Sequence, residues 1–158
     1  MAEPLADQVL RMIGEARESY YRLILMVGPA GSGKTSALQE VSATTSAPLI
    51  NVNLELSRRM LDLTERQRAQ QAPRLLGDIV GEATGELVLL DNIEVLFDVH
   101  LKLAPLRLLQ GLSRNTTVVA AWNGSIVDDR MTYAVPDHPE YRRYPIRDFL
   151  VVSPEVTP

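Results

Sequence analysis

The distribution of apolar residues predicts a chain in which helices and strands alternate. In the first helical segment, residues 4–20, apolar side chains recur every three or four positions, at Leu5, Val9, Met12, Ile13 and Ala16. The apolar run over residues 21–27 is nearly continuous, which is typical of a strand buried on both faces. Residues 33–42 then predict a short helix, so the chain begins helix, strand, helix.

The same alternation continues to the end of the chain. Strands are predicted at residues 48–53, 86–91, 116–122 and 146–152, and helical segments at residues 54–83 and 95–113. Thr64 with Gln67 resembles a capping box, Pro73 suits the first turn of a further helix, and Pro105 marks a break or a start. A short hairpin is expected around residues 131–135. Together these elements indicate a parallel sheet with helices on both faces.

A glycine-rich loop follows the first strand and carries the strongest chemical signal. Its sequence, "GPAGSGKT" from Gly28 to Thr35, matches G-x-x-x-x-G-K-[S/T] at every fixed position. Such glycines let backbone N–H groups point at phosphate oxygens, while Lys34 reaches the β- and γ-phosphates and the Thr35 hydroxyl ligates Mg²⁺. The alternative is an accidental glycine-rich turn, but the strand before it and the helix after it favour phosphate binding. The expected nucleotide-binding residues are Gly28, Pro29, Ala30, Gly31, Ser32, Gly33, Lys34, Thr35 and Ser36.

The strand at residues 86–91 ends on an acid, Asp91. A carboxylate at the carboxyl end of a strand lies at the sheet edge where ligands gather in open α/β folds. We expect Asp91, together with Thr35, to hold Mg²⁺. Alternatively, Asp91 caps a helix that begins near Glu94.

The residue that would activate water is the open question. Asn92 follows Asp91, and an amide cannot act as a base near neutral pH. Glu94 is the nearest following acid, and it either points into the site as the base or merely occupies the first turn of a helix. Asn123, at the end of the strand at residues 116–122, could orient water, although "NG" is also a turn signal. Trp122 is expected in the core or at an interface rather than as a base-stacking platform.

Composition narrows the class of protein. The chain has 158 residues, 46% of them hydrophobic, no cysteine and two histidines, which fits a single domain and makes disulfides and zinc sites poor candidates. No apolar run approaches a membrane span, and the N-terminus lacks the pattern of a secretory signal, so a cytoplasmic location without a membrane partner is expected.

Charge argues against a general attraction to nucleic acid. The formal net charge is −4, so DNA contact is expected only indirectly or through a local basic patch. Patches could form around Arg58 and Arg59, around Arg66 and Arg68, or around Arg142, Arg143 and Arg147, but a solvated helix face is the favoured interpretation of the first two groups.

With these residues in place, the chain resembles the AAA+ branch of P-loop ATPases. The phosphate loop, the acidic strand "LVLLDNIEVLF", the strand "VVAAWN" and a last strand preceded by arginines occur in the family's order. The resemblance implies an α/β, three-layer P-loop fold with a five-stranded, mostly parallel sheet, and ATP or ADP with Mg²⁺ as ligands. The expected organisation is one domain over residues 1–158, with an amphipathic helix at 1–20, a nucleotide-binding core at 21–153 and a tail at 154–158.

The chain departs from the AAA+ pattern in three places. The family motif D-E-x-D/E is matched by Asp91 and Glu94 but not by Asn92. No helical lid is expected, because the sequence ends shortly after the last strand. The arginine that completes a neighbouring site in the family is assigned to Arg142 or Arg143, with Arg114 as a further possibility; the alternative is that these arginines only aid solubility.

More narrowly, "LDNIEVLF", "PLRLLQGLSRNTTVVAAWNG" and "HPEYRRYP" resemble the BrxF family, small P-loop proteins of type-three bacteriophage exclusion (BREX) systems. This implies a component of an antiphage defence system that acts beside larger partners, including a DNA methyltransferase.

Two functions are therefore expected. The first is a slow ATPase in which Lys34, Glu94 and Asn123 act on the nucleotide and an arginine from a neighbour completes the site. The second is an assembly module that binds nucleotide with little turnover, self-associating or recruiting other defence proteins. A GTPase is disfavoured because N-K-x-D is absent, and a small-molecule kinase because no arginine-bearing lid is evident.

Overall fold

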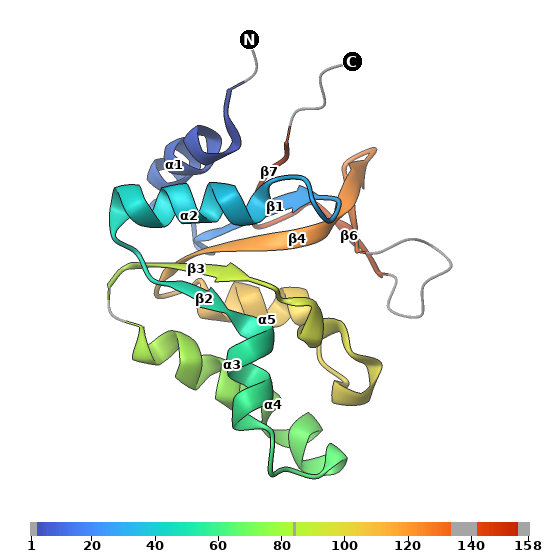
Figure 1. Ribbon diagram of the computed structural model, residues 1–158. Helices are drawn as coiled ribbons and strands as arrows, with labels where there is room; N and C mark the ends of the chain where they lie inside the picture. Colours follow the sequence, from blue (N-terminus) through green and yellow to red (C-terminus); the bar gives the residue numbers. More distant parts are fainter. Residues whose placement is uncertain (1–2, 84, 134–141, 155–158) are drawn as a thin grey trace.

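The computed structural model describes residues 3–83, 85–133 and 142–154. These residues form three layers, with a central sheet between two groups of helices (Figure 1). Among them, no helix is long and apolar enough to span a bilayer.

The elements follow the predicted alternation. The helices are α1 (Leu5–Ala16), α2 (Lys34–Thr45), α3 (Val52–Arg59), α4 (Glu65–Glu82) and α5 (Pro105–Leu112), with the 3₁₀ turns η1 (Glu94–Phe97) and η2 (Val99–Leu101). The strands are β1 (Leu23–Gly28), β2 (Leu49–Asn51), β3 (Leu87–Asp91), β4 (Thr117–Val127), β5 (Arg130–Tyr133), β6 (Arg142–Pro145) and β7 (Leu150–Val152).

Five parallel strands form the centre of the sheet in the order β2-β3-β4-β1-β7. The register pairs Gly28 of β1 with Asn123 of β4, and Asn51 of β2 with Asp91 of β3. Because parallel strands end at the same edge, the phosphate loop, Asp91 and Asn123 meet there. The predicted five-stranded parallel sheet is confirmed.

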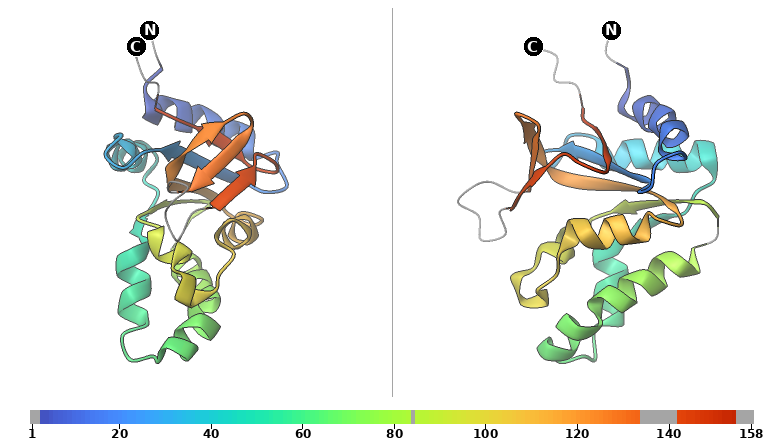
Figure 2. Two further views of the ribbon diagram at one scale, coloured as in Figure 1. Left: turned by 90° about the vertical axis from the view of Figure 1, so that its right-hand side faces the viewer. Right: turned by 180° about the vertical axis from the view of Figure 1, so that it is seen from behind.

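Each face of the sheet has its own apolar core. The face under α1 and α2 buries Ile24, Met26, Leu89 and Val119. The face under α3, α4 and α5 buries the alternate residues of the same strands. Consecutive residues of a strand point to opposite faces, so strands buried on both faces read as continuous apolar runs. Helices lie on both sides of the sheet (Figure 2), and this arrangement explains the continuous apolar runs in the sequence.

The sheet has two strands more than predicted, because β4 does not stop at Asn123. It runs on to Val127, turns at Asp128 and Asp129, and pairs antiparallel with β5, which pairs with β6. Asp128 and Asp129 both have positive φ, as a two-residue hairpin turn requires. The interpretation of "NG" as a turn is therefore wrong, because both residues lie within β4. Of the hairpin expected around residues 131–135, residues 131–133 lie in β5, and 134 and 135 fall outside the described residues.

Two helical predictions also need correction. Residues 95–113 form two 3₁₀ turns and α5 rather than a long helix, and Pro105 occupies the first position of α5. The capping box of Thr64 and Gln67 is confirmed at the start of α4, but Pro73 lies inside that helix. Pro73 is exposed, so the carbonyl it leaves unpaired can bond to water, while Ala72 and Leu76 pack against the core.

Candidate nucleotide-binding site

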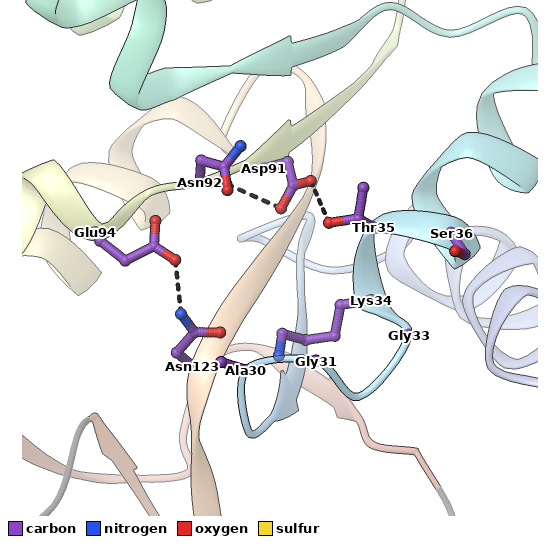
Figure 3. A pocket seen from close by; sticks show the side chains of 10 residues that line it. All are labelled: Ala30, Gly31, Gly33, Lys34, Thr35, Ser36, Asp91, Asn92, Glu94 and Asn123. Atoms are coloured by element: carbon purple, nitrogen blue, oxygen red, sulfur yellow. Dashed lines mark hydrogen bonds between the residues drawn. The ribbon is translucent and has the colours of Figure 1, made fainter.

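A cavity of about 440 Å³ lies at the carboxyl edge of the parallel strands (Figure 3). Its walls come from the phosphate loop and the start of α2, from the segment that follows β3, and from β4. The lining residues are Ala30, Gly31, Gly33, Lys34, Thr35, Ser36, Asp91, Asn92, Glu94 and Asn123. The cavity thus brings together residues from three separate parts of the chain. Six of the nine predicted loop residues line it, whereas Gly28, Pro29 and Ser32 do not.

The phosphate loop has a conformation that its glycines make possible. Gly31 and Gly33 have φ values of 78° and 90°, in a region that costs other residues roughly 1–2 kcal/mol. Gly33 immediately precedes α2, whose N-terminal N–H groups carry a partial positive charge at the loop. The loop and the start of the helix therefore have the backbone geometry and partial positive charge that suit an anion.

The Lys34 ammonium lies across the loop. It donates hydrogen bonds to the carbonyl oxygens of Gly28 and Pro29, at 2.8 and 2.7 Å, and to the Ser32 hydroxyl at 3.2 Å. Burial lowers the Lys34 pKa, while the carboxylates of Asp91 and Glu94 act in the opposite direction. A cation held in this poorly hydrated position gains strongly from an anionic ligand beside it.

Asp91 and Thr35 form the part of the cavity that suits a hard cation. The Thr35 hydroxyl donates to Asp91 Oδ2 at 2.7 Å, and the backbone N–H of Asn92 donates to Asp91 Oδ1 at 2.9 Å. Asp91 therefore does not cap the turn that begins at Glu94, for which no side-chain cap is formed. No cluster of three metal-binding side chains occurs among the described residues, which is ordinary for Mg²⁺ because substrate phosphates supply its other ligands.

Asn92 has a structural role that the sequence motif does not reveal. Its φ is 53°, a left-handed conformation that asparagine tolerates better than most residues. The Asn92 carbonyl accepts from the N–H of Asn53, whose side-chain oxygen accepts from the N–H of Val95 at 2.8 Å. Asn53 was not predicted as a site residue; its position just after β2, beside β3 in the sheet, is the signal that could have identified it.

Glu94 points into the cavity, where it contacts Asn123. Asn123 Nδ2 donates to Glu94 Oε1 at 2.6 Å, while Glu94 Oε2 is buried and has no partner among the described residues (Figure 3). Glu94 also occupies the first turn of η1, so both interpretations of this residue hold for its position. This oxygen is therefore an acceptor without a partner, shielded from solvent in this conformation.

The strand that carries Asn123 is fixed by packing on its opposite face. Trp122 is fully buried, and its Nε1 donates to the Thr132 carbonyl at 2.9 Å. Gly124 follows, and a Cβ atom there would overlap the same carbonyl oxygen. Trp122 is therefore a core residue, as expected, and the β4–β5 hairpin holds the position of Asn123.

The predicted arginines lie outside this cavity. Arg142 and Arg143 are neighbours on β6, so their side chains alternate; Arg142 is partly buried and Arg143 is exposed. The Arg114 guanidinium lies 4.9 Å from the centre of the Tyr20 ring, at the opposite end of β4 from Asn123. None of the three lines the cavity, and an action on a neighbouring subunit stays a prediction.

Comparison with known proteins places the chain in a family. The family model described as "ATPase family associated with various cellular activities (AAA)" matches residues 24–123, from β1 to Asn123. No curated protein matches. Solved structures that match include the Drosophila ORC bound to DNA, at 18% identity over 94% of this chain with a TM-score of 0.49, and C. elegans PCH-2, at 21% identity over 78% with a TM-score of 0.41.

The chain spans about two fifths of each solved chain, 41% and 38% respectively. The family match, in contrast, covers the phosphate loop, the acidic strand and the strand that ends at Asn123, which are the segments that build the cavity. The chain therefore belongs to the AAA family of ATPases.

Proposed function

We propose that the protein binds ATP with Mg²⁺ and hydrolyses it slowly. The carrying observation is the pair formed by Glu94 and Asn123, which faces Lys34 across the cavity and leaves one carboxylate oxygen free. The protein thus has an acid where a water could be bound, although Asn92 occupies the place of the family's usual glutamate.

The donor set fits Mg²⁺ and a polyphosphate. Thr35 Oγ1 and Asp91 Oδ2 are oxygen ligands already 2.7 Å apart, and the loop amides and Lys34 provide the positive field for phosphate oxygens. Bound there, Mg²⁺ would neutralise charge on the phosphate oxygens.

The remaining residues orient water and accept its proton. In our proposal, Asn123 positions Glu94 through Oε1, and a rotation of the Glu94 side chain brings Oε2 to the cavity. The carboxylate then accepts the proton as the water oxygen attacks the terminal phosphorus and the bond from that phosphorus to ADP breaks. ADP and inorganic phosphate are then released. An arginine of a neighbouring subunit or partner, with Arg143 the exposed candidate and Arg142 its alternative, would stabilise the transferring phosphoryl group and speed this slow reaction.

A second candidate function is a nucleotide-gated assembly module with little intrinsic hydrolysis. It is favoured by Asn92, whose left-handed backbone is held by Asn53 and which supplies no base. In this case the change between ATP and ADP would alter the surface that a larger partner recognises.

The cellular role we propose follows the resemblance to the BrxF family. The protein would be a cytoplasmic component of a bacterial BREX antiphage system, self-associating or acting with other defence proteins. Contact with DNA would be indirect or limited to a local basic patch, since the net charge is −4.

Phosphate release by the purified protein tests the proposal. Wild type should release phosphate slowly, Lys34→Ala should neither bind nor hydrolyse, and Glu94→Gln should keep its ATP–Mg²⁺ thermal shift while turnover falls about 10²- to 10⁴-fold. Glu40→Gln, an exposed acid on α2, is the matched control. Equal release by wild type and Lys34→Ala would refute hydrolysis at this site. A thermal shift without turnover would support the assembly module instead.

A further inference from the structure

A second cavity, of about 620 Å³, lies between α5 and the segment that runs from β6 towards β7. It shares no lining residue with the nucleotide cavity. Its lining combines an apolar part, formed by Leu103, Pro105, Leu106, Tyr144 and Pro145, with a polar part, formed by Arg107, Gln110, Arg142, Arg147 and Asp148.

Positive charge dominates the polar part, which contains three arginines and one aspartate. The side chains of Arg107, Arg142 and Arg147 form no hydrogen bond or ion pair with any described residue, and Arg142 Nε is fully buried without an acceptor. A buried donor left unpaired costs free energy of the order of 1–3 kcal/mol. The three unpaired guanidinium groups that line the cavity therefore favour an anionic ligand.

The Arg142 side chain is held in place by β6 and its neighbours. Arg142 pairs with Tyr133 of β5, and the next residue that points the same way, Tyr144, packs edge-on against Trp122 with ring centres 5.5 Å apart. Burial raises the Tyr144 pKa, and the nearby Arg142 charge partly opposes that rise. A charge positioned before the ligand arrives reduces the entropy lost on binding.

We propose that this cavity binds an acidic peptide segment of a partner protein. The carboxylates would pair with the arginines, and apolar side chains beside them would pack on Leu103, Leu106 and Pro145. Gln110 and Asp148 offer acceptors for the N–H groups of a peptide backbone, which a phosphodiester backbone lacks.

A nucleic-acid strand fits these observations less well. Strand binding needs a basic track along several nucleotides and exposed aromatic faces. Among the described residues, Arg11, Arg58, Arg59 and Arg74 are paired with acids and do not contribute to such a track. Lys102, Arg130 and Arg143 add positive charge beside the cavity, but exposed aromatic faces do not accompany them. Tyr144 is only partly exposed and packs against Trp122. The cavity is compact, as expected for a few side chains.

Fluorescence anisotropy with the full chain tests the proposal. The probe is a labelled decapeptide that alternates aspartate with leucine, and the matched probe replaces each aspartate by asparagine. Wild type should bind the acidic probe saturably and the neutral probe weakly. In Arg107→Gln/Arg147→Gln the affinity should fall at least about tenfold, because both exposed charges contribute. Arg17→Gln, an exposed arginine at the end of α1, should change nothing.

Controls separate this site from the nucleotide site. Unfolding temperature and the thermal shift with ATP–Mg²⁺ should be unchanged in Arg107→Gln/Arg147→Gln, since both side chains are exposed and lie outside the nucleotide cavity. Failure of ATP binding would therefore leave this proposal standing. It would be overturned by no saturable binding up to about 1 mM, by equal binding to the double variant, or by an oligothymidylate that binds more tightly than the acidic probe and depends on the same arginines.

Discussion

The contact between Glu94 and Asn123 allows the fold and the chemistry of the cavity to be tested separately. Two variants are compared. Asn123→Asp replaces the amide alone, and Glu94→Gln with Asn123→Asp exchanges the positions of the amide and the carboxylate. In the single variant, two carboxylates would face each other across the 2.6 Å that now separates donor and acceptor. In the double variant, an amide at position 94 can again donate to a carboxylate at position 123.

The magnitude follows from the geometry. The hydrogen bond to a charged group is worth about 1.5–3 kcal/mol. Repulsion at this distance would reach about 6 kcal/mol for an effective dielectric constant of about 20, but proton uptake and rotation limit it. We expect Asn123→Asp to lose about 3 kcal/mol in the free energy of unfolding, equivalent to about 6–12 °C in Tm. The double variant should recover most of this loss.

Urea unfolding provides the stability assay, because the chain has a single tryptophan, Trp122, which is fully buried next to Asn123. Phosphate release provides the second readout. The double variant should remain as slow as Glu94→Gln, since the carboxylate has moved to β4. If the double variant stays as unstable as Asn123→Asp, the hydrogen bond does not form. If it regains wild-type turnover, a carboxylate at position 94 is not required.

Two further predictions concern backbone positions beside the cavity. Asn92→Gly should leave the stability within about 0.5 kcal/mol of wild type, whereas Asn92→Ala should lose about 1 kcal/mol because of the positive φ; equal unfolding midpoints in urea for the two variants would contradict this. Gly124→Ala should lower the free energy of unfolding by about 3 kcal/mol, because its Cβ would overlap the Thr132 carbonyl that Trp122 Nε1 uses. Gly111→Ala, where a Cβ meets no atom, is the control for thermal unfolding. Equal Tm values for Gly124→Ala and Gly111→Ala would show that the β4–β5 hairpin shifts to accommodate the added Cβ atom.

Much of the nucleotide site could be predicted because its residues lie in a contiguous loop motif or directly at the ends of apolar strands. The loop motif defines Lys34 and Thr35, and apolar runs that end in Asp91 and before Asn123 indicate parallel strands that end at one edge. The orientation of Glu94 could not be predicted. It depends on the left-handed backbone of Asn92, held by a residue nearly forty positions earlier in the chain.

The second cavity could be predicted only in part, because Arg142 and Arg147 form a candidate basic patch in the sequence whereas Arg107 lies far from them. Arg107 lies in α5, Arg142 on β6 and Arg147 beyond it, and they come together only because β4 continues into the hairpin. That continuation was hidden because Asn123 and Gly124 form a common turn pair, and because β6 is short and half polar. Local sequence patterns predict helices and strands well. A cavity lined by segments far apart in the sequence depends on tertiary packing, which such patterns do not reveal.

Strand β4 forms part of the wall of the nucleotide cavity and also supports a residue that lines the second cavity. Asn123 and Trp122 are consecutive on β4, so one side chain lies in the nucleotide cavity while the other packs on Tyr144, which lines the second cavity. A rotation of β4 about its own axis would shift Asn123 and Trp122 in opposite directions, because their side chains lie on opposite faces of the strand. If nucleotide and peptide favoured different rotations, each would change the affinity of the other by the same factor.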